Sequence, residues 1–298
     1  MINSMEELIQ QAQNHATATA VVAGAAGREV LESIKKARED NVLEPLLVGD
    51  KDKIRGIAEE VDLSLDEDEI ISASGSKQIC SRSVELLASD EADLLMKGLV
   101  ETSSLLKEIL RDEYDLKSKQ MLSHVVLAEV PALDRLIFIS DGGMNICPDQ
   151  NDKAAIVQNV IDCARKLGWE DPRVALLAAV EKTREDMPET LDAAVISKMA
   201  DRGQISGGIV EGPFALDNAL SSSAAKIKGL SGPVAGKADI LITPNISSGN
   251  LLGKSVIYFA GGRFAAFLGG TEKPVVVTSR SDSAEIRYIS LAAAAAMV

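Results

Sequence analysis

The segment TSRSDS at residues 278–283 brings hydroxyl, guanidinium and carboxylate groups together. It follows the apolar run PVVV and precedes a segment with helical periodicity, so we expect a turn from a strand into a helix. At such a turn an arginine can bind two phosphate oxygens, and the helix N-terminus adds N–H donors and the positive end of its dipole. Ser279 and Arg280 are therefore candidates for an anion site. A serine-rich cap with a solvated arginine explains the spacing equally well.

A second turn of this kind follows residues 238–244, ADILITP, which predict a strand. Short side chains at such a turn let a ligand approach the backbone amides of the helix N-terminus. The candidate substrate-binding residues in this turn are Asn245, Ser247, Gly249 and Asn250. A turn without a function is also consistent with the pattern, because every sheet of this type contains such turns.

A third candidate region begins at the end of the strand predicted for residues 92–98, ADLLMKG. Lys97 can reach a phosphate as a point charge. Thr102 and Ser103 open the helix predicted for residues 103–113, where their hydroxyls can bind substrate or act only as caps, with Thr102 placed as the N-cap.

Acid–base chemistry would fall to carboxylates. His15 and His124 are the only histidines, and the chain has no HExxH, GxSxG or GxxxxGK[ST] motif, which disfavours a zinc site, an α/β-hydrolase and a P-loop NTPase. The carboxylates near predicted turns are Asp282, Glu285, Asp141 and Asp217, and each of them alone could equally be a cap or a solvated charge.

Charge and composition narrow the choice of partners and compartment. The net charge of −14 opposes binding to nucleic acid or to an anionic membrane surface. The N-terminal segment is polar and acidic, unlike a signal peptide, and the longest apolar run, at 291–298, is too short to span a bilayer. Three cysteines without a CxxC spacing fit a reducing compartment. We therefore expect a cytoplasmic protein.

Short apolar runs alternate with helical segments, which is typical of βα units on a parallel sheet. We expect an α/β protein of two lobes, with residues 1–131 and 275–298 in the first, residues 132–274 in the second, and the active site in the cleft between them. Pro131 marks the boundary because proline breaks helix and strand alike. The predicted strands are 17–24, 43–49, 92–98, 123–130, 135–141, 173–180, 207–214, 238–244 and 274–279, and the predicted helices are 28–39, 77–89, 103–113, 152–168, 188–203, 250–262 and 282–297.

Two long stretches resemble one known family. Residues 212–259, which include GKADILITPNISSGNLLGKS, and residues 273–286, KPVVVTSRSDSAEI, are similar to the phosphate acetyltransferase/phosphate butyryltransferase family, and more to its shorter butyryl branch. Similar patterns occur in MKGLVETSSLLKEIL, SHVV and ISDGGMNICPDQNDKAAIVQNVI. The resemblance thus covers most of residues 90–298.

The resemblance implies a two-lobed α/β/α fold with the isocitrate/isopropylmalate-dehydrogenase-like topology, assembled as a homodimer or a larger homo-oligomer. It implies the reaction of acyl-CoA with phosphate to give acyl phosphate and free coenzyme A, with coenzyme A as a co-substrate and without a tightly bound cofactor or metal. The alternatives are an NAD- and metal-dependent dehydrogenase of the same topology and a non-catalytic relative that binds coenzyme A.

The resemblance also assigns roles to individual residues. Arg280 would engage the phosphoryl oxygens, and Ser279 would donate a hydrogen bond. The acetyl branch carries a catalytic aspartate at a position that aligns here with Ile286, which leaves Glu285 or Asp282 as the base that deprotonates the coenzyme A thiol.

The chain departs from the family pattern at one further position. Asn245 stands where the family motif Pro-Asp-x-x-x-Gly-Asn carries an aspartate, and this change leaves the preferred acyl group open.

Overall fold

The computed structural model describes residues 2–118 and 121–298, and the chain divides into two compact units. The terminal unit consists of Met5–Ser118 and Ala265–Val298. The central unit consists of Lys119–Phe264 together with Met1–Ser4. The α/β class predicted from the sequence is confirmed in both units.

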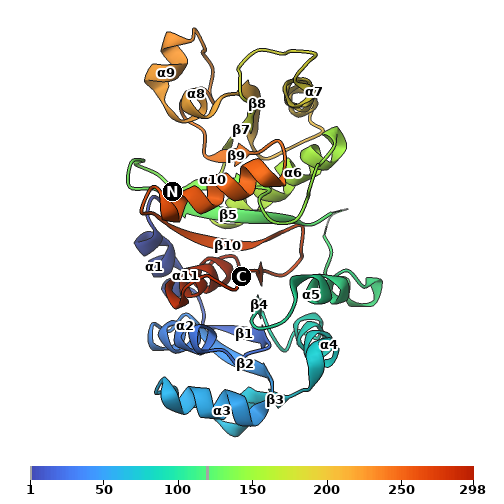
Figure 1. Cartoon of the computed structure of the whole chain (residues 1–298), viewed down its shortest axis with the longest axis vertical. Helices are drawn as coiled ribbons and strands as arrows, with labels where there is room; N and C mark the ends of the chain where they lie inside the picture. Colours follow the sequence, from blue (N-terminus) through green and yellow to red (C-terminus); the bar gives the residue numbers. More distant parts are fainter. Residues whose placement is uncertain (1, 119–120) are drawn as a thin grey trace. The chain divides into compact units, whose positions relative to one another are not determined.

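The sheet of the terminal unit has the strand order β3-β2-β1-β4-β11-β10. Neighbouring strands are parallel except β10, which is antiparallel to β11. Figure 1 shows α2 and α11 on one side of β1 and β4, and α4 and α5 on the other. Strands covered on both faces are buried almost throughout, as the burial of β1 and β4 shows. The strands are β1 (Ala18–Ala23), β2 (Leu43–Gly49), β3 (Ile70–Ser72), β4 (Leu94–Lys97), β10 (Arg263–Gly269) and β11 (Val275–Val276).

Two helices of the terminal unit show why this sequence packs in this way. Helix α2 buries Val30, Leu31, Ile34 and Ala37, whose spacing places them on one helical face. Helix α11 packs against α2 with a run of buried alanines at 292–296, which lets the two helices approach closely. The helices of this unit are α1 (Met5–Asn14), α2 (Arg28–Glu39), α3 (Lys51–Glu60), α4 (Gly75–Ala88), α5 (Thr102–Ile109) and α11 (Ala284–Ala295), with short 3₁₀ turns η1 (Glu67–Glu69) and η2 (Asp112–Tyr114).

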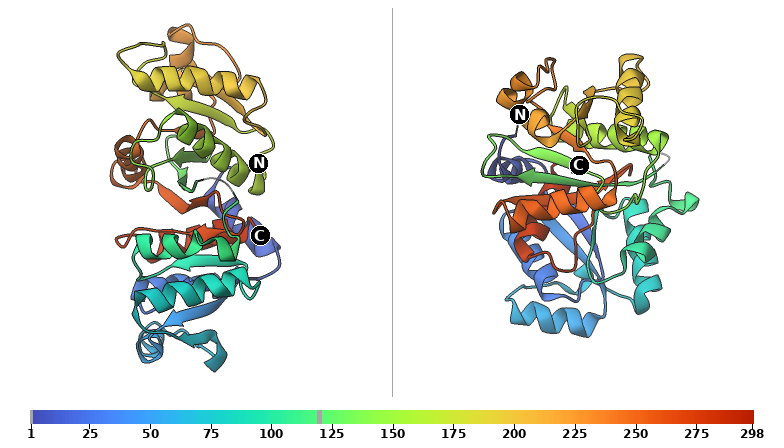
Figure 2. Two further views of the ribbon diagram at one scale, coloured as in Figure 1. Left: turned by 90° about the vertical axis from the view of Figure 1, so that its right-hand side faces the viewer. Right: turned by 45° about the horizontal axis from the view of Figure 1, so that its top comes forward.

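The sheet of the central unit has the order β5-β6-β9-β7-β8, in which only the β5–β6 pair is antiparallel. Helices α6 and α7 pack side by side, as Figure 2 shows in green and yellow. The elements are β5 (Ser123–Glu129), β6 (Ile137–Ser140), α6 (Gln150–Lys166), β7 (Arg173–Leu177), α7 (Pro188–Asp201), β8 (Ile209–Phe214), α8 (Leu216–Leu220), α9 (Ser222–Ile227), β9 (Ile240–Ile242) and α10 (Ile246–Tyr258).

The division between the units falls earlier than the proline-based boundary. Val126 of β5 is paired with Ile139 of β6, so the two strands on either side of Pro131 form one hairpin within the central unit. The chain returns to the terminal unit at residue 265 rather than 275, because β10, which the sequence analysis did not predict, pairs with β11. No helix in the described ranges 2–118 and 121–298 is both long and apolar enough to cross a membrane.

Candidate active site

The turn between β11 and α11 lies beside the end of β4. Val276 of β11 is paired with Met96 of β4 in parallel register, so the residues that follow both strands emerge at the same edge of the sheet. Lys97 therefore comes close enough to Arg280, Asp282 and Arg287 for their charges to act on its ammonium group. The structure thus brings Lys97 of the third candidate region close to the first candidate region.

Ser279 is held through its backbone. Its N–H donates to Oδ2 of Asp282 at 2.7 Å, and its carbonyl oxygen accepts from Asp282 N at 3.2 Å and from Nη2 of Arg287 at 2.9 Å. The Ser279 hydroxyl lies 3.1 Å from the hydroxyl of Ser281. Ser279 and Arg280 are exposed, so the turn presents a hydroxyl and a guanidinium to solvent while its backbone is fixed from below.

Asp282 and Thr102 do not act as the caps predicted for them. The N-cap of α11 is Ser283, whose hydroxyl accepts from Ile286 N at 3.3 Å, because the buried carboxylate of Asp282 is already used by Ser279. The N-cap of α5 is Glu101, and Thr102 is the first helical residue. Neither Asp282 nor Thr102 is the N-cap of its helix.

Two buried cations lie behind the turn. Lys97 and Arg287 are each 3% exposed, and no carboxylate among the described residues is within ion-pair distance of either. Burial lowers the pKa of Lys97, and the charges of Arg287 and Arg280 lower it further, against an opposing effect of Asp282. Burial also lowers the pKa of Arg287. The edge of the sheet therefore carries two buried positive charges, which Asp282 compensates in part and at longer range than an ion pair.

The end of β4 is packed directly against the end of β1. Gly98 N donates to Ala23 O at 2.9 Å, and Leu99 N donates to Gly24 O at 2.7 Å. A Cβ on Gly98 would lie 2.3 Å from Gly24 O, so only glycine fits there. This contact fixes the direction in which the chain leaves Lys97 toward Thr102, which is partly exposed, and Ser103, which is exposed.

The other predicted residues lie in the central unit, around the N-terminus of α10. Asn245 is the N-cap of α10 and accepts from Ser248 N at 3.0 Å, and Nδ2 of Asn250 donates to Gly142 O at 3.1 Å. A Cβ on Gly249 would lie 2.3 Å from Asp141 O. The short side chains in this turn therefore serve a close approach of two backbone segments, and Ser247 and Asn250 remain exposed.

Asp141, one of the predicted acid–base candidates, holds a loop together. Its Oδ1 accepts from Gly143 N and Met144 N, both at 2.8 Å, and its Oδ2 accepts from His124 N at 2.9 Å and from Nδ2 of Asn145 at 2.7 Å. Four hydrogen bonds to one buried carboxylate define a structural role.

Asp217, another of the acid–base candidates, is paired with Lys228 at 3.1 Å in the same unit.

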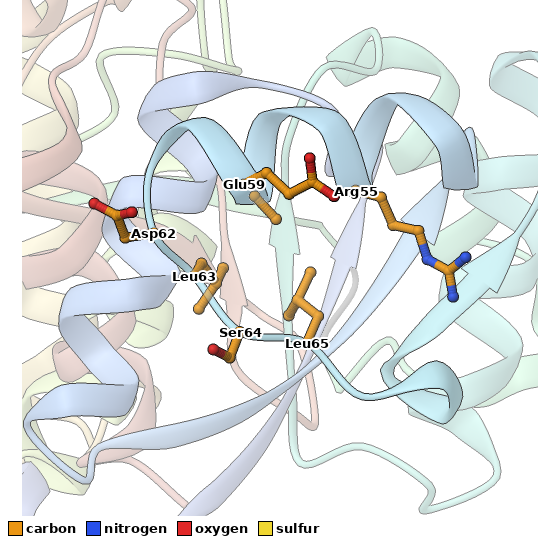
Figure 3. A pocket seen from close by; sticks show the side chains of 7 residues that line it. Arg55, Glu59, Asp62, Leu63, Ser64 and Leu65 are labelled. Atoms are coloured by element: carbon orange, nitrogen blue, oxygen red, sulfur yellow. The ribbon is translucent and has the colours of Figure 1, made fainter.

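Two hollows of the described structure are lined by none of the candidate residues. An open hollow of ≈ 560 Å³ beside α3 is lined by residues of that helix and the segment after it (Figure 3), and it contains no candidate residue. A small cavity lined by Lys153, Leu176, Ile196 and Thr243 lies in the central unit. Among residues 2–118 and 121–298, no group of three or more His, Cys, Asp or Glu side chains is placed to hold a metal ion.

Two cysteines are unsuited to nucleophilic chemistry. Burial raises the pKa of the Cys163 thiol to about 12 and also raises that of Cys80, so both stay protonated near neutral pH.

Sequence reasoning missed Arg287, which the structure places in the same cluster, and named Thr278 only as part of the segment 278–283. Nη1 of Arg287 donates to Oγ1 of Thr278 at 2.8 Å. A signal was present in the sequence, because Arg287 shares a helical face with Leu291 and Ala294, four and seven residues further on, and both are buried. A single cation on an otherwise apolar face is a candidate for a buried functional charge.

The terminal unit thus has the features of a doubly wound α/β protein: parallel strands covered on both faces and a cationic strand-to-helix turn at their carboxyl edge. Turns of this kind often bind anions in such proteins. Residues 77–296 match the model of the family described as "Phosphate acetyl/butaryl transferase". The chain belongs to this family.

Individual relatives agree with the family match. The phosphate butyryltransferase of Clostridium beijerinckii is 42% identical over 295 residues, which cover 99% of this chain and 98% of the relative. The phosphate acetyltransferase of Rhizobium meliloti is 39% identical over 290 residues, covering 97% of this chain and 92% of the relative. Among solved structures, a branched-chain phosphotransacylase from Enterococcus faecalis V583 superimposes with a TM-score of 0.82 at 35% identity, covering 94% of this chain and 99% of that one. None of the three is named a dehydrogenase.

Proposed function

We propose that this chain transfers a short acyl group between coenzyme A and inorganic phosphate. Family membership and the names of the butyryl-, acetyl- and branched-chain relatives support this reaction. The observation that carries it is the exposed Ser279–Arg280 pair, on a turn whose backbone is fixed and behind which two cations are buried. Such a turn suits an oxyanion that changes its bonding during the reaction.

In the proposed reaction a phosphate oxygen forms a bond to the acyl carbon, the carbon–sulfur bond breaks, and the coenzyme A thiolate leaves and takes up a proton. In the reverse direction a base removes the thiol proton, sulfur bonds to the acyl carbon and phosphate leaves. Arg280 and the Ser279 hydroxyl hold the phosphate oxygens, and Lys97 adds a charge from the end of β4. Thr102 and Ser103 are the remaining substrate-binding candidates of this unit.

The base is proposed to be Glu285 or Asp282. Glu285 is exposed in the first turn of α11, where a substrate thiol can reach it. Asp282 is buried, and its Oδ2 accepts a hydrogen bond from Ser279 N. The geometry therefore favours Glu285, because Asp282 has a structural task that a change of protonation would disturb.

Four residues at the α10 turn of the central unit are also proposed to bind substrate. They are Asn245, Ser247, Gly249 and Asn250, and their position at a helix N-terminus supports this role.

We propose that the protein acts as a homodimer or larger homo-oligomer. Three large apolar side chains of α10 and its end support self-association, because Leu251 is 72% exposed, Tyr258 72% and Phe259 91%.

The same proposal includes a cytoplasmic location and coenzyme A as the co-substrate. It includes no tightly bound cofactor and, among the partners, no nucleic acid and no membrane. Three free cysteines in the described chain are consistent with a reducing compartment.

The test is phosphate-dependent release of thiol from acetyl-, propionyl-, butyryl- and isobutyryl-CoA. Arg280→Ala should reduce kcat/KM by about 10²–10³, the usual effect of removing one fixed donor to a developing charge. Arg82→Ala, an exposed arginine on α4 of the same unit, is the matched control and should leave the rate unchanged. Wild-type rates in Arg280→Ala would exclude the proposed phosphate site.

A further inference from the structure

Arg287 makes all its side-chain hydrogen bonds with the turn at Thr278 and Ser279. Its two terminal nitrogens donate to Thr278 Oγ1 at 2.8 Å and to Ser279 O at 2.9 Å. Its Nε is buried and donates to no atom of the described structure. The guanidinium therefore bridges one side chain and one carbonyl that are adjacent in the turn, and it does so from the second turn of α11.

An arginine at this position would lower the stability of the folded state if its only role were packing. The remainder of α11 is dominated by buried apolar residues, and a buried charge without an ion-pair partner destabilises the fold relative to an apolar side chain. The carboxylates of Asp282 and Glu29 favour the charged form of Arg287, but both lie beyond ion-pair distance of its guanidinium. The charge of Lys97 adds to the imbalance. An anion bound at the exposed side of the turn would offset this cost.

We propose that Arg287 is the positioning residue of the phosphate site. Its guanidinium holds the Thr278–Ser279 peptide so that the Ser279 hydroxyl and Arg280 face the same oxyanion, and its buried charge, together with that of Lys97, makes the site select a doubly charged anion over a singly charged one. This inference rests on the proposed transfer reaction and names the residue behind its phosphate specificity.

Two substitutions separate the bridge from the charge. Arg287→Lys keeps the charge, but an ammonium cannot reproduce the planar fork that spans both acceptors. Arg287→Gln keeps a hydrogen-bond donor and loses the charge. Ser290→Ala is the matched control on the same helix, because the Ser290 hydroxyl donates to Ile286 O at 2.7 Å and accepts from Ala266 N at 2.9 Å without contact to the turn.

The experiment measures kcat, the KM for phosphate and the KM for butyryl-CoA, together with inhibition by sulfate and by nitrate. Arg287→Gln should raise the KM for phosphate by about 10- to 100-fold, the range for a lost charge-assisted hydrogen bond, with little change in the KM for butyryl-CoA. It should also lose the preference for sulfate over nitrate, which Arg287→Lys keeps. Ser290→Ala should change neither KM nor the anion preference.

Two further variants, Thr278→Val alone and combined with Arg287→Lys, keep the proposal testable if Arg287→Gln fails to fold. Thr278→Val removes one acceptor of the bridge and preserves the shape of the side chain. Its effect on the KM for phosphate should be smaller in the Arg287→Lys background than in wild type, because both changes break the same contact. Additive effects of Thr278→Val and Arg287→Lys on the KM for phosphate would refute the proposed bridge.

The outcomes distinguish this inference from the proposed function. Equal increases in both KM values, or an unchanged anion preference in Arg287→Gln, would show that Arg287 only packs α11. A wild-type protein that releases no thiol would refute the transfer reaction. In that case protection of wild type but not of Arg287→Gln against thermal unfolding by inorganic phosphate would still support the anion site.

Discussion

Lys97 should weaken the folded protein while it strengthens phosphate binding. Its ammonium is almost completely buried beside the positive charges of Arg287 and Arg280, and no described carboxylate is paired with it. Lys97→Met keeps the length and apolar stem of the side chain and removes the charge. We expect this variant to raise the free energy of unfolding of the ligand-free protein by about 1–3 kcal/mol, since apolar replacements of buried charges are neutral or stabilising in that range.

The same variant, Lys97→Met, should bind phosphate more weakly than wild type. Loss of a charge-assisted interaction with a dianion should raise the phosphate dissociation constant by about 10- to 100-fold. The difference in stability should also depend on pH. Because the folded pKa of Lys97 lies below its value in the unfolded chain, the unfolded state binds more protons between these two values, and wild-type stability rises with pH in that window. The advantage of Lys97→Met should therefore shrink as the pH is raised.

Urea unfolding with and without inorganic phosphate measures both effects in one series. Lys107→Met, on the exposed side of α5, is the control and should shift stability by less than about 0.5 kcal/mol. A less stable Lys97→Met protein with unchanged phosphate affinity would refute the reasoning, because it would make Lys97 an ordinary packing residue.

Three further changes test other parts of the structure. Gly249→Ala should destabilise the protein by more than about 1 kcal/mol, because its Cβ would lie 2.3 Å from Asp141 O, whereas Gly253→Ala, with no atom within 4 Å, should be neutral or stabilising in the same urea titration. Glu285→Gln should lower kcat for thiol release by about 10²–10⁴ if Glu285 is the base, and an unaffected rate would exclude it. Phe259→Ser should shift the molar mass measured by light scattering toward the monomer, and an unchanged mass would place the interface elsewhere.

Periodicity in the sequence predicted most of the sheet because buried parallel strands are short apolar runs that stand out between polar helices. The strand β10 was missed for a physical reason. Its residues, RFAAFLG, follow the run YFAGG directly, so the apolar pattern continues from the end of α10 without a polar segment between them. Both strands of the β5–β6 hairpin were predicted, but not their pairing. Pro131 between them was interpreted as a boundary between lobes, whereas it is a turn residue within one unit.

The candidate site was only partly predictable. Ser279 and Arg280 could be found because their turn is local in the sequence. Arg287 could not be assigned in the same way, since its task depends on the second turn of a helix folding back onto Thr278. Asp141 shows the reverse problem: its carboxylate suits chemistry, and only the hydrogen bonds of the folded chain reveal that it organises a loop.

The pairing of β4 with β11 also has a consequence for biosynthesis. Lys97 is translated long before Val276, and the central unit is made between them. At about 5–20 residues per second, roughly ten to forty seconds separate the synthesis of the two strands. During that interval a nascent chain exposes the unpaired edge of β4, and the proposed phosphate site cannot form until β11 and α11 have left the ribosome. Nascent chains halted before residue 275 should therefore bind chaperones but not phosphate.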